Sequence, residues 1–148
     1  MENFFAQAKK FDGYQPIIWT NIEPNKLIEI NKELKDITVK DIRILKTNYE
    51  ELLDFLLQPA NYIPQEIINA RKFNAVLIEL AKYLILENQG GIIADLGFKF
   101  SDNPDKKFLN SSTFIAPTNE ASRATLENNF LLAKPNHPIL KEVLYDFL

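Results

Sequence analysis

A long helical pattern that runs into a double glycine and then into a short apolar segment is the strongest constraint that this sequence places on its fold. Apolar residues recur three and four positions apart from Phe73 to Leu84, which predicts a well-buried helix. Gly90 and Gly91 supply the left-handed backbone that a helix needs in order to end, and residues 92–96 then have the character of a buried strand. The sequence therefore predicts a single unit of helix, glycine turn and strand.

Shorter strand and helix patterns alternate around this unit. Strands are expected over residues 16–19, 37–45, 114–116 and 130–133. Helices are expected over 24–34, over 49–57 and from 138 onwards. Asn48 and Glu51 are spaced as a capping box for the second of these helices, and the polar segment 101–112 is expected to be a surface loop. This alternation predicts an α/β fold with a mostly parallel central sheet flanked by helices, in which ligands bind beyond the carboxyl ends of the strands.

Length and composition narrow the class of protein. The 148 residues suit a single domain spanning 1–148, and a net charge of -3 without a long basic run argues against nucleic acid as a partner. The absence of cysteine excludes disulfides and thiolate zinc sites. We see no signal peptide and no apolar run long enough to span a membrane, so we expect a cytoplasmic protein or one delivered as part of a larger protein. The last apolar helical stripe has no cap, which is typical of a chain truncated at its C-terminus.

Asp95 is the residue that most needs an explanation, because it lies at the carboxyl end of the predicted buried strand. A carboxylate without a partner near a core costs several kcal/mol of desolvation. A divalent cation on a diphosphate ligand would compensate this charge, since Mg²⁺ and Mn²⁺ bind carboxylate and phosphate oxygens. Asp95 would otherwise cap the turn that follows it.

Glu79 and Lys82 lie three residues apart on the polar flank of the central helix. They are spaced to form an i,i+3 ion pair, which stabilises a helix by about 0.2 to 0.5 kcal/mol. In a binding site, Glu79 would instead accept from ribose or sugar hydroxyls and Lys82 would donate to a sugar or a diphosphate. The residues alone leave both interpretations open.

Together these residues resemble the signature of the DXD-motif glycosyltransferases. In the sugar-binding-region family and the related catalytic domains of large clostridial toxins, a helix carrying Asp-x-x-Arg ends in Gly-Gly and leads into a strand ending in Asp-x-Asp. Here Glu79 and Lys82 stand at the helix positions, the double glycine matches, and Asp95 stands at the first aspartate of the metal motif. Three flanking features also fit the family, namely Trp19 in the first strand, the pair Asn128 and Asn129, and the dipeptide His137-Pro138.

The resemblance implies a GT-A fold that binds a nucleoside-diphosphate sugar, in particular a UDP-sugar, and transfers the sugar to an acceptor that the sequence does not identify. It implies catalytic roles for Asp95 and Lys82, with Asp95 binding Mn²⁺ or Mg²⁺. It also implies substrate contacts from Lys82 and from four further residues, Trp19 at the base, Glu79 at a sugar hydroxyl, and Asn128 and Asn129 near the phosphate or metal.

The sequence departs from this family at the second motif aspartate, which is Gly97 here and has no side chain to bind a metal. Asp102 and Asp105 in the following loop are the candidates to replace it. A catalytically degenerate relative that acts as a binding or protein-interaction domain is therefore the alternative function. Trp19 also suits ordinary core packing, the asparagine pair suits a turn, and we expect His137 to be a helix-entry residue.

Overall fold

The computed structural model describes residues 13–95, 97–99, 105–118 and 127–148. The helices of this part are α2 (Pro24–Ile30), α3 (Glu50–Leu57), α4 (Gln65–Ile68), α5 (Arg71–Gln89), α6 (Lys106–Ser111) and α7 (Pro138–Tyr145). The strands are β1 (Ile17–Thr20), β2 (Thr38–Asp41), β3 (Gly91–Ala94), β4 (Phe114–Ile115) and β5 (Phe130–Ala133). Short 3-10 helices cover Lys32–Leu34, Ile42–Ile44 and Pro59–Asn61. In the described segments, no helix combines the length and apolar character needed to cross a bilayer.

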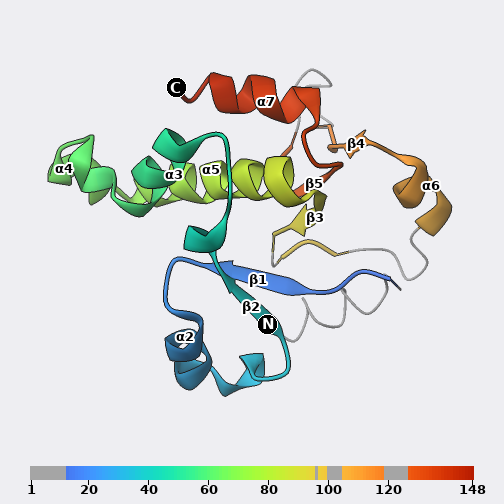
Figure 1. The fold of residues 1–148 in the computed structure, drawn as a ribbon, viewed down its shortest axis with the longest axis horizontal. Coiled ribbons are helices and arrows are strands. Elements are labelled where there is room, and N and C mark those ends of the chain that lie inside the picture. Colours follow the sequence, from blue (N-terminus) through green and yellow to red (C-terminus); the bar gives the residue numbers. More distant parts are fainter. Residues whose placement is uncertain (1–12, 96, 100–104, 119–126) are drawn as a thin grey trace.

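Helix α5 organises the molecule, with α7 on one side of it and the β1–β2 pair on the other (Figure 1). Its apolar stripe packs against α3 and α7, and Leu80, Leu84 and Leu144 are completely inaccessible to solvent. The predicted buried helix is confirmed for most of its stripe. Val76 is the exception, since 42% of its surface is exposed on the flank of the helix.

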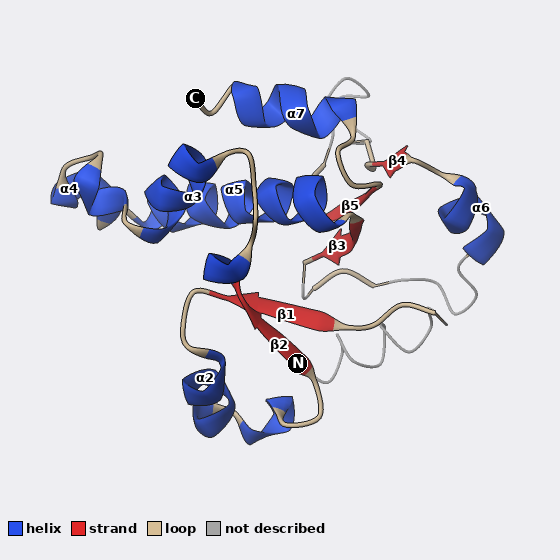
Figure 2. Cartoon of the chain, viewed as in Figure 1, coloured by secondary structure: helices blue, strands red, loops and turns tan. Residues whose placement is uncertain are grey.

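The strands form two small sheets rather than one (Figure 2). Strands β1 and β2 pair in parallel, with Trp19 opposite Lys40, and α2 lies in the crossover that joins them. Strand β5 lies between β3 and β4 and runs antiparallel to both. The prediction of a mixed α/β fold is confirmed, but the prediction of a mostly parallel central sheet is wrong for the described strands. Apolar runs show where strands form without giving the direction in which each one pairs.

The local predictions succeed and fail for identifiable reasons. Helix α3 begins at Glu50 with Tyr49 as its N-cap, and no side chain caps it, so the capping box predicted at Asn48 and Glu51 is wrong. The Tyr49 amide donates instead to the hydroxyl of Thr47. Part of the predicted loop is helix α6, while residues 101–104 lie outside the described part. The helix predicted over 24–34 is divided at Asn31, whose side chain caps the following 3-10 turn.

Candidate functional site

A cleft of about 650 Å³ lies between β1 and the α5–β3 unit. The two glycines that end α5 contribute to its lining, together with an apolar wall that includes Ile17, Ile85 and Ile93. Gly90 adopts φ 65 and ψ -166, a conformation that is accessible almost only to glycine. The double glycine therefore ends α5 and begins β3 beside the cleft, as the sequence predicts.

Three of the predicted site residues line this cleft from three separate segments, namely Trp19 on β1, Lys82 on α5 and Asp95 immediately after β3. The other predicted residues, Glu79, Asn128 and Asn129, lie outside the lining of the cleft. The folding of the chain thus brings together residues that are more than seventy positions apart in the sequence.

Lys82 is the most deeply buried charged group at the site, with 8% of its surface exposed. Its ammonium nitrogen lies 2.7 Å from Asp95 Oδ1, 3.1 Å from Glu79 Oε1 and 3.3 Å from the backbone oxygen of Asn128. Burial lowers the pKa of Lys82, but the hydrogen bonds to Asp95 and then to Glu79 raise it by more, so its pKa lies above the ordinary value. Lys82 is therefore charged at neutral pH.

The three oxygen atoms around Lys82 match the three N–H donors of an ammonium group. Lys82 can consequently bind a ligand only by releasing one of these partners. Asp95 is different, because 49% of its side chain is exposed and it lines the cleft. The group best placed to meet a ligand at this end of the cleft is therefore the carboxylate of Asp95.

The asparagine pair supports the site from behind. The side-chain amide of Asn128 donates to Glu79 Oε2 at 2.5 Å, so both oxygens of Glu79 have partners within the protein. The backbone oxygen of Asn129 accepts from the Asp95 amide at 2.9 Å, although its own Oδ1 is buried without a partner among the described residues. In this arrangement Glu79 and Asn128 position Lys82. Their predicted contacts with a substrate, and that of Asn129, stay predictions.

Trp19 is half-buried and packs against the main core cluster as well as lining the cleft. The Lys40 ammonium lies over the indole, 5.4 Å from the ring centroid, in a cation–π contact. The ring therefore contributes to core packing and is also part of the cleft lining, and its predicted stacking on a base stays a prediction.

With Lys82 in place, the described residues do not fit a divalent cation at Asp95. Among them, no three histidine or acidic side chains are grouped closely enough to bind a metal. Asp95 already binds an ammonium through one of its oxygens, and Gly97 contributes no ligand. Asp102 lies outside the described residues, and Asp105 is exposed near the start of α6. The implied binding of Mn²⁺ or Mg²⁺ at Asp95 stays a prediction that this donor set does not support.

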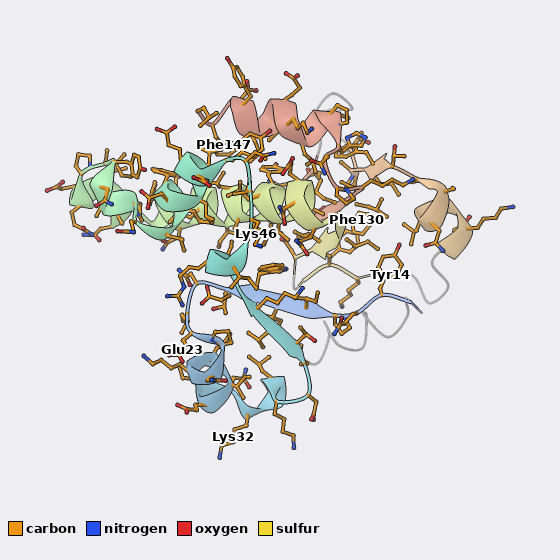
Figure 3. All side chains as sticks on the ribbon, viewed as in Figure 1. Tyr14, Glu23, Lys32, Lys46, Phe130 and Phe147 are labelled. Atoms are coloured by element: carbon orange, nitrogen blue, oxygen red, sulfur yellow. The ribbon has the colours of Figure 1, made fainter. Side chains whose placement is uncertain are left out.

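Other residues near the cleft carry no signal in the sequence. Tyr14, labelled in Figure 3 just before β1, lines the cleft, and its hydroxyl donates to Asn110 Oδ1 on α6 at 3.2 Å. Phe98 also lines the cleft and stacks on Phe130, with ring centroids 5.2 Å apart. Isolated aromatic residues of this kind follow no motif or spacing, so only the folded chain reveals them.

His137 behaves as the sequence predicts for a helix-entry residue. It is the N-cap of α7, and its Nδ1 accepts from the Ile139 amide at 3.3 Å. Its ring stacks on Phe114 at a centroid distance of 5.1 Å. His137 therefore has a structural role at the start of α7.

Comparison with known protein families finds no match to this chain, and comparison with curated proteins finds no significant match either.

Proposed function

We propose that the cleft binds a nucleoside-diphosphate sugar, in particular a UDP-sugar, and that the domain transfers the sugar to an acceptor hydroxyl. The observation that supports this proposal is the meeting of Trp19, Lys82 and Asp95 in one cleft of about 650 Å³. This volume lies within the range of roughly 300 to 1,000 Å³ that is typical of small-molecule sites. The resemblance in the sequence motif supports the same class of ligand.

Two residues of the cleft lining are suited to two parts of such a donor. The indole of Trp19 provides a flat surface on which a base can stack, an interaction that contributes about 1 to 3 kcal/mol. The half-exposed Asp95 carboxylate accepts hydrogen bonds, which suits the hydroxyls of a ribose or a sugar. The apolar part of the lining, which includes Ile17, Ile85 and Ile93, would limit the access of water to the bond that is cleaved.

In the transfer, the acceptor oxygen forms a bond to the anomeric carbon while the bond from that carbon to the diphosphate oxygen breaks. The acceptor proton passes to solvent, and the nucleoside diphosphate leaves with the electron pair. The buried ammonium of Lys82 lies against Asp95 and offsets negative charge of the protein close to this step.

A catalytically degenerate binding domain is the second candidate, and two observations favour it. Gly97 replaces the second acidic residue of the motif, and the donors of Lys82 are all occupied by groups of the protein. Such a domain would bind the sugar nucleotide without cleaving it.

Fluorescence of Trp19, the single tryptophan of the chain, gives a direct test. UDP-glucose and other sugar nucleotides are titrated against the wild type, and release of UDP is then followed with and without candidate acceptors. Saturable quenching with UDP release supports the transferase, and saturable quenching alone supports the binding domain. Absence of any saturable response to every sugar nucleotide refutes both.

The variant Asp95→Asn keeps the size of the side chain and removes its charge. We expect affinity to fall by about tenfold or more, because hydrogen bonds to charged groups contribute about 1.5 to 3 kcal/mol. Asp36→Asn, at an exposed position away from the cleft lining, is the matched control and should bind like the wild type. Equal affinity of the two variants for the sugar nucleotide would show that Asp95 does not contact the ligand.

A further inference from the structure

The ammonium of Lys82 lies inside a cage of three oxygen atoms, which we call the Lys82 cage. Its members are Glu79 Oε1, Asp95 Oδ1 and the backbone oxygen of Asn128, at 3.1, 2.7 and 3.3 Å from the nitrogen. Two carboxylates and a carbonyl are the hard oxygen donors that proteins use for Mg²⁺, Ca²⁺ and Mn²⁺. The ammonium of Lys82 is thus surrounded by the same kinds of oxygen atom that bind a metal cation in a protein.

The cage is held in position by the rest of the fold. Asn128 contributes its carbonyl to the cage and its side-chain amide to the second oxygen of Glu79. The backbone of Asp95 is tied to Asn129, and the helix α5 carries both Glu79 and Lys82. The hydrogen bond from Asn128 to Glu79 and the backbone bond from Asp95 to Asn129 do not involve the ammonium, so they hold the Glu79 carboxylate and the backbone at Asp95 in place when it is removed.

Charge explains why a second cation is disfavoured while Lys82 is present. The two carboxylates carry two negative charges, and the buried ammonium offsets one of them at contact distance. A divalent ion bound to Asp95 Oδ1 would have to displace the ammonium or lie against it, and like charges at such separations repel strongly. Removal of the ammonium would leave two neighbouring carboxylates without a counter-ion.

We propose that Lys82 is a built-in cation that takes the place of a divalent metal ion on Asp95. The wild-type protein then binds its ligand without a divalent cation, and loss of the lysine side chain converts the cage into a divalent-cation site. The statement about the ligand rests on the proposed function. The statement about the cage stands on the geometry alone and is tested with the metal by itself.

Mn²⁺ binding without any nucleotide is measured by calorimetry and by electron paramagnetic resonance for the wild type and for Lys82→Ala. We expect Lys82→Ala to bind one Mn²⁺ at least about tenfold more tightly than the wild type, because a unit positive charge has left the cage. The double variant Lys82→Ala with Asp95→Asn should lose this gain. Equal affinity in the wild type and Lys82→Ala, whether tight or undetectable, would overturn the proposal.

A second variant and a fold control keep this test decisive. Lys82→Met retains the apolar stem of the side chain and removes the charge, so it reports on the cage even if Lys82→Ala is unstable. Mn²⁺ should raise the melting temperature of either variant and leave that of the wild type unchanged. Stabilisation of the wild type by as much as the variants would contradict the inference.

The ligand is then tested separately by titrating UDP-glucose into the wild type with a chelator and with millimolar Mn²⁺. We expect the same affinity to within about twofold under both conditions, as reported by Trp19 fluorescence, since the metal gains no place on Asp95. A requirement for Mn²⁺ would overturn the inference. No binding under either condition would refute the proposed function and leave the result on the Lys82 cage standing.

Discussion

Replacement of Gly90 by alanine should be the most damaging single methyl addition in the turn between α5 and β3. Gly90 has φ 65 and ψ -166, and non-glycine residues in this region are strained by about 1 to 3 kcal/mol. A Cβ atom there would also lie 2.5 Å from Pro135 Cδ and 2.8 Å from Pro135 N. Steric overlap of this kind destabilises the folded state by about a further 1 to 3 kcal/mol, because the proline ring and its backbone can move away only by distorting the turn. We therefore expect Gly90→Ala to lower the free energy of unfolding by about 2 to 6 kcal/mol.

Substitutions at two other glycines, Gly91 and Gly97, distinguish the backbone strain from the steric overlap with Pro135. Gly91 has φ 103, but none of the described residues would contact a Cβ atom added there within 4 Å, so Gly91→Ala should show the backbone strain alone. Gly97 has neither feature, and Gly97→Ala should change stability by less than about 0.5 kcal/mol. Urea denaturation followed by circular dichroism gives the three values. A Gly90→Ala variant no less stable than Gly91→Ala would show that the packing of Pro135 on the turn is not as described.

Further predictions concern the core and one surface ion pair. Leu84 is completely buried, so Leu84→Ala should lower the free energy of unfolding by about 3 to 5 kcal/mol. Ile30 is 76% exposed, so Ile30→Ala should lower it by less than about 0.5 kcal/mol in the same urea titration. The side-chain hydrogen bonds from Arg43 hold the pKa of Asp41 in the folded protein below its ordinary value. The contact therefore contributes fully to stability above about pH 4, the ordinary pKa of an aspartate. This contribution is lost as the pH falls through the pKa of Asp41 in the folded protein. Arg43→Met should raise the pKa of Asp41 in an NMR titration, and an unchanged value would contradict this assignment.

Periodicity predicts the fold where burial repeats along one element. The stripe through Leu80 and Leu84, the end of the helix at Gly90, and the strand at Phe130–Ala133 all follow from local patterns, and the structure has them. Strand direction is different because it depends on how distant segments meet. Strand β5 pairs antiparallel with β3, and the residue pattern of neither segment indicates this direction. The prediction of a parallel central sheet is wrong for this reason.

The site is predictable to the extent that its residues belong to one motif. The motif resemblance assigns Lys82 and Asp95 to one site, and both line the cleft, where they form an ion pair of 2.7 Å. The involvement of the Asn128 carbonyl is a backbone contact between segments 46 residues apart, which no side-chain pattern encodes. For the same reason the sequence does not reveal that three oxygen atoms of the protein surround the Lys82 ammonium, and the predicted contact of Lys82 with a sugar or a diphosphate stays a prediction.

Two of the departures from the glycosyltransferase motif that the sequence resembles, Lys82 for arginine and Gly97 for aspartate, offset one another in the proposed Lys82 cage. A compact ammonium fits inside three oxygens as a point charge, whereas a planar guanidinium would spread its donors beyond them. With the ammonium in place, the cage needs neither a metal nor a second motif carboxylate. A Cβ atom added at Gly97 would meet none of the described residues within 4 Å. Restoring the carboxylate with Gly97→Asp should therefore create no Mn²⁺ site in the wild type but should tighten Mn²⁺ binding in Lys82→Ala. Calorimetry on the single and double variants decides this, and tight binding by Gly97→Asp alone would show that Lys82 does not exclude the metal.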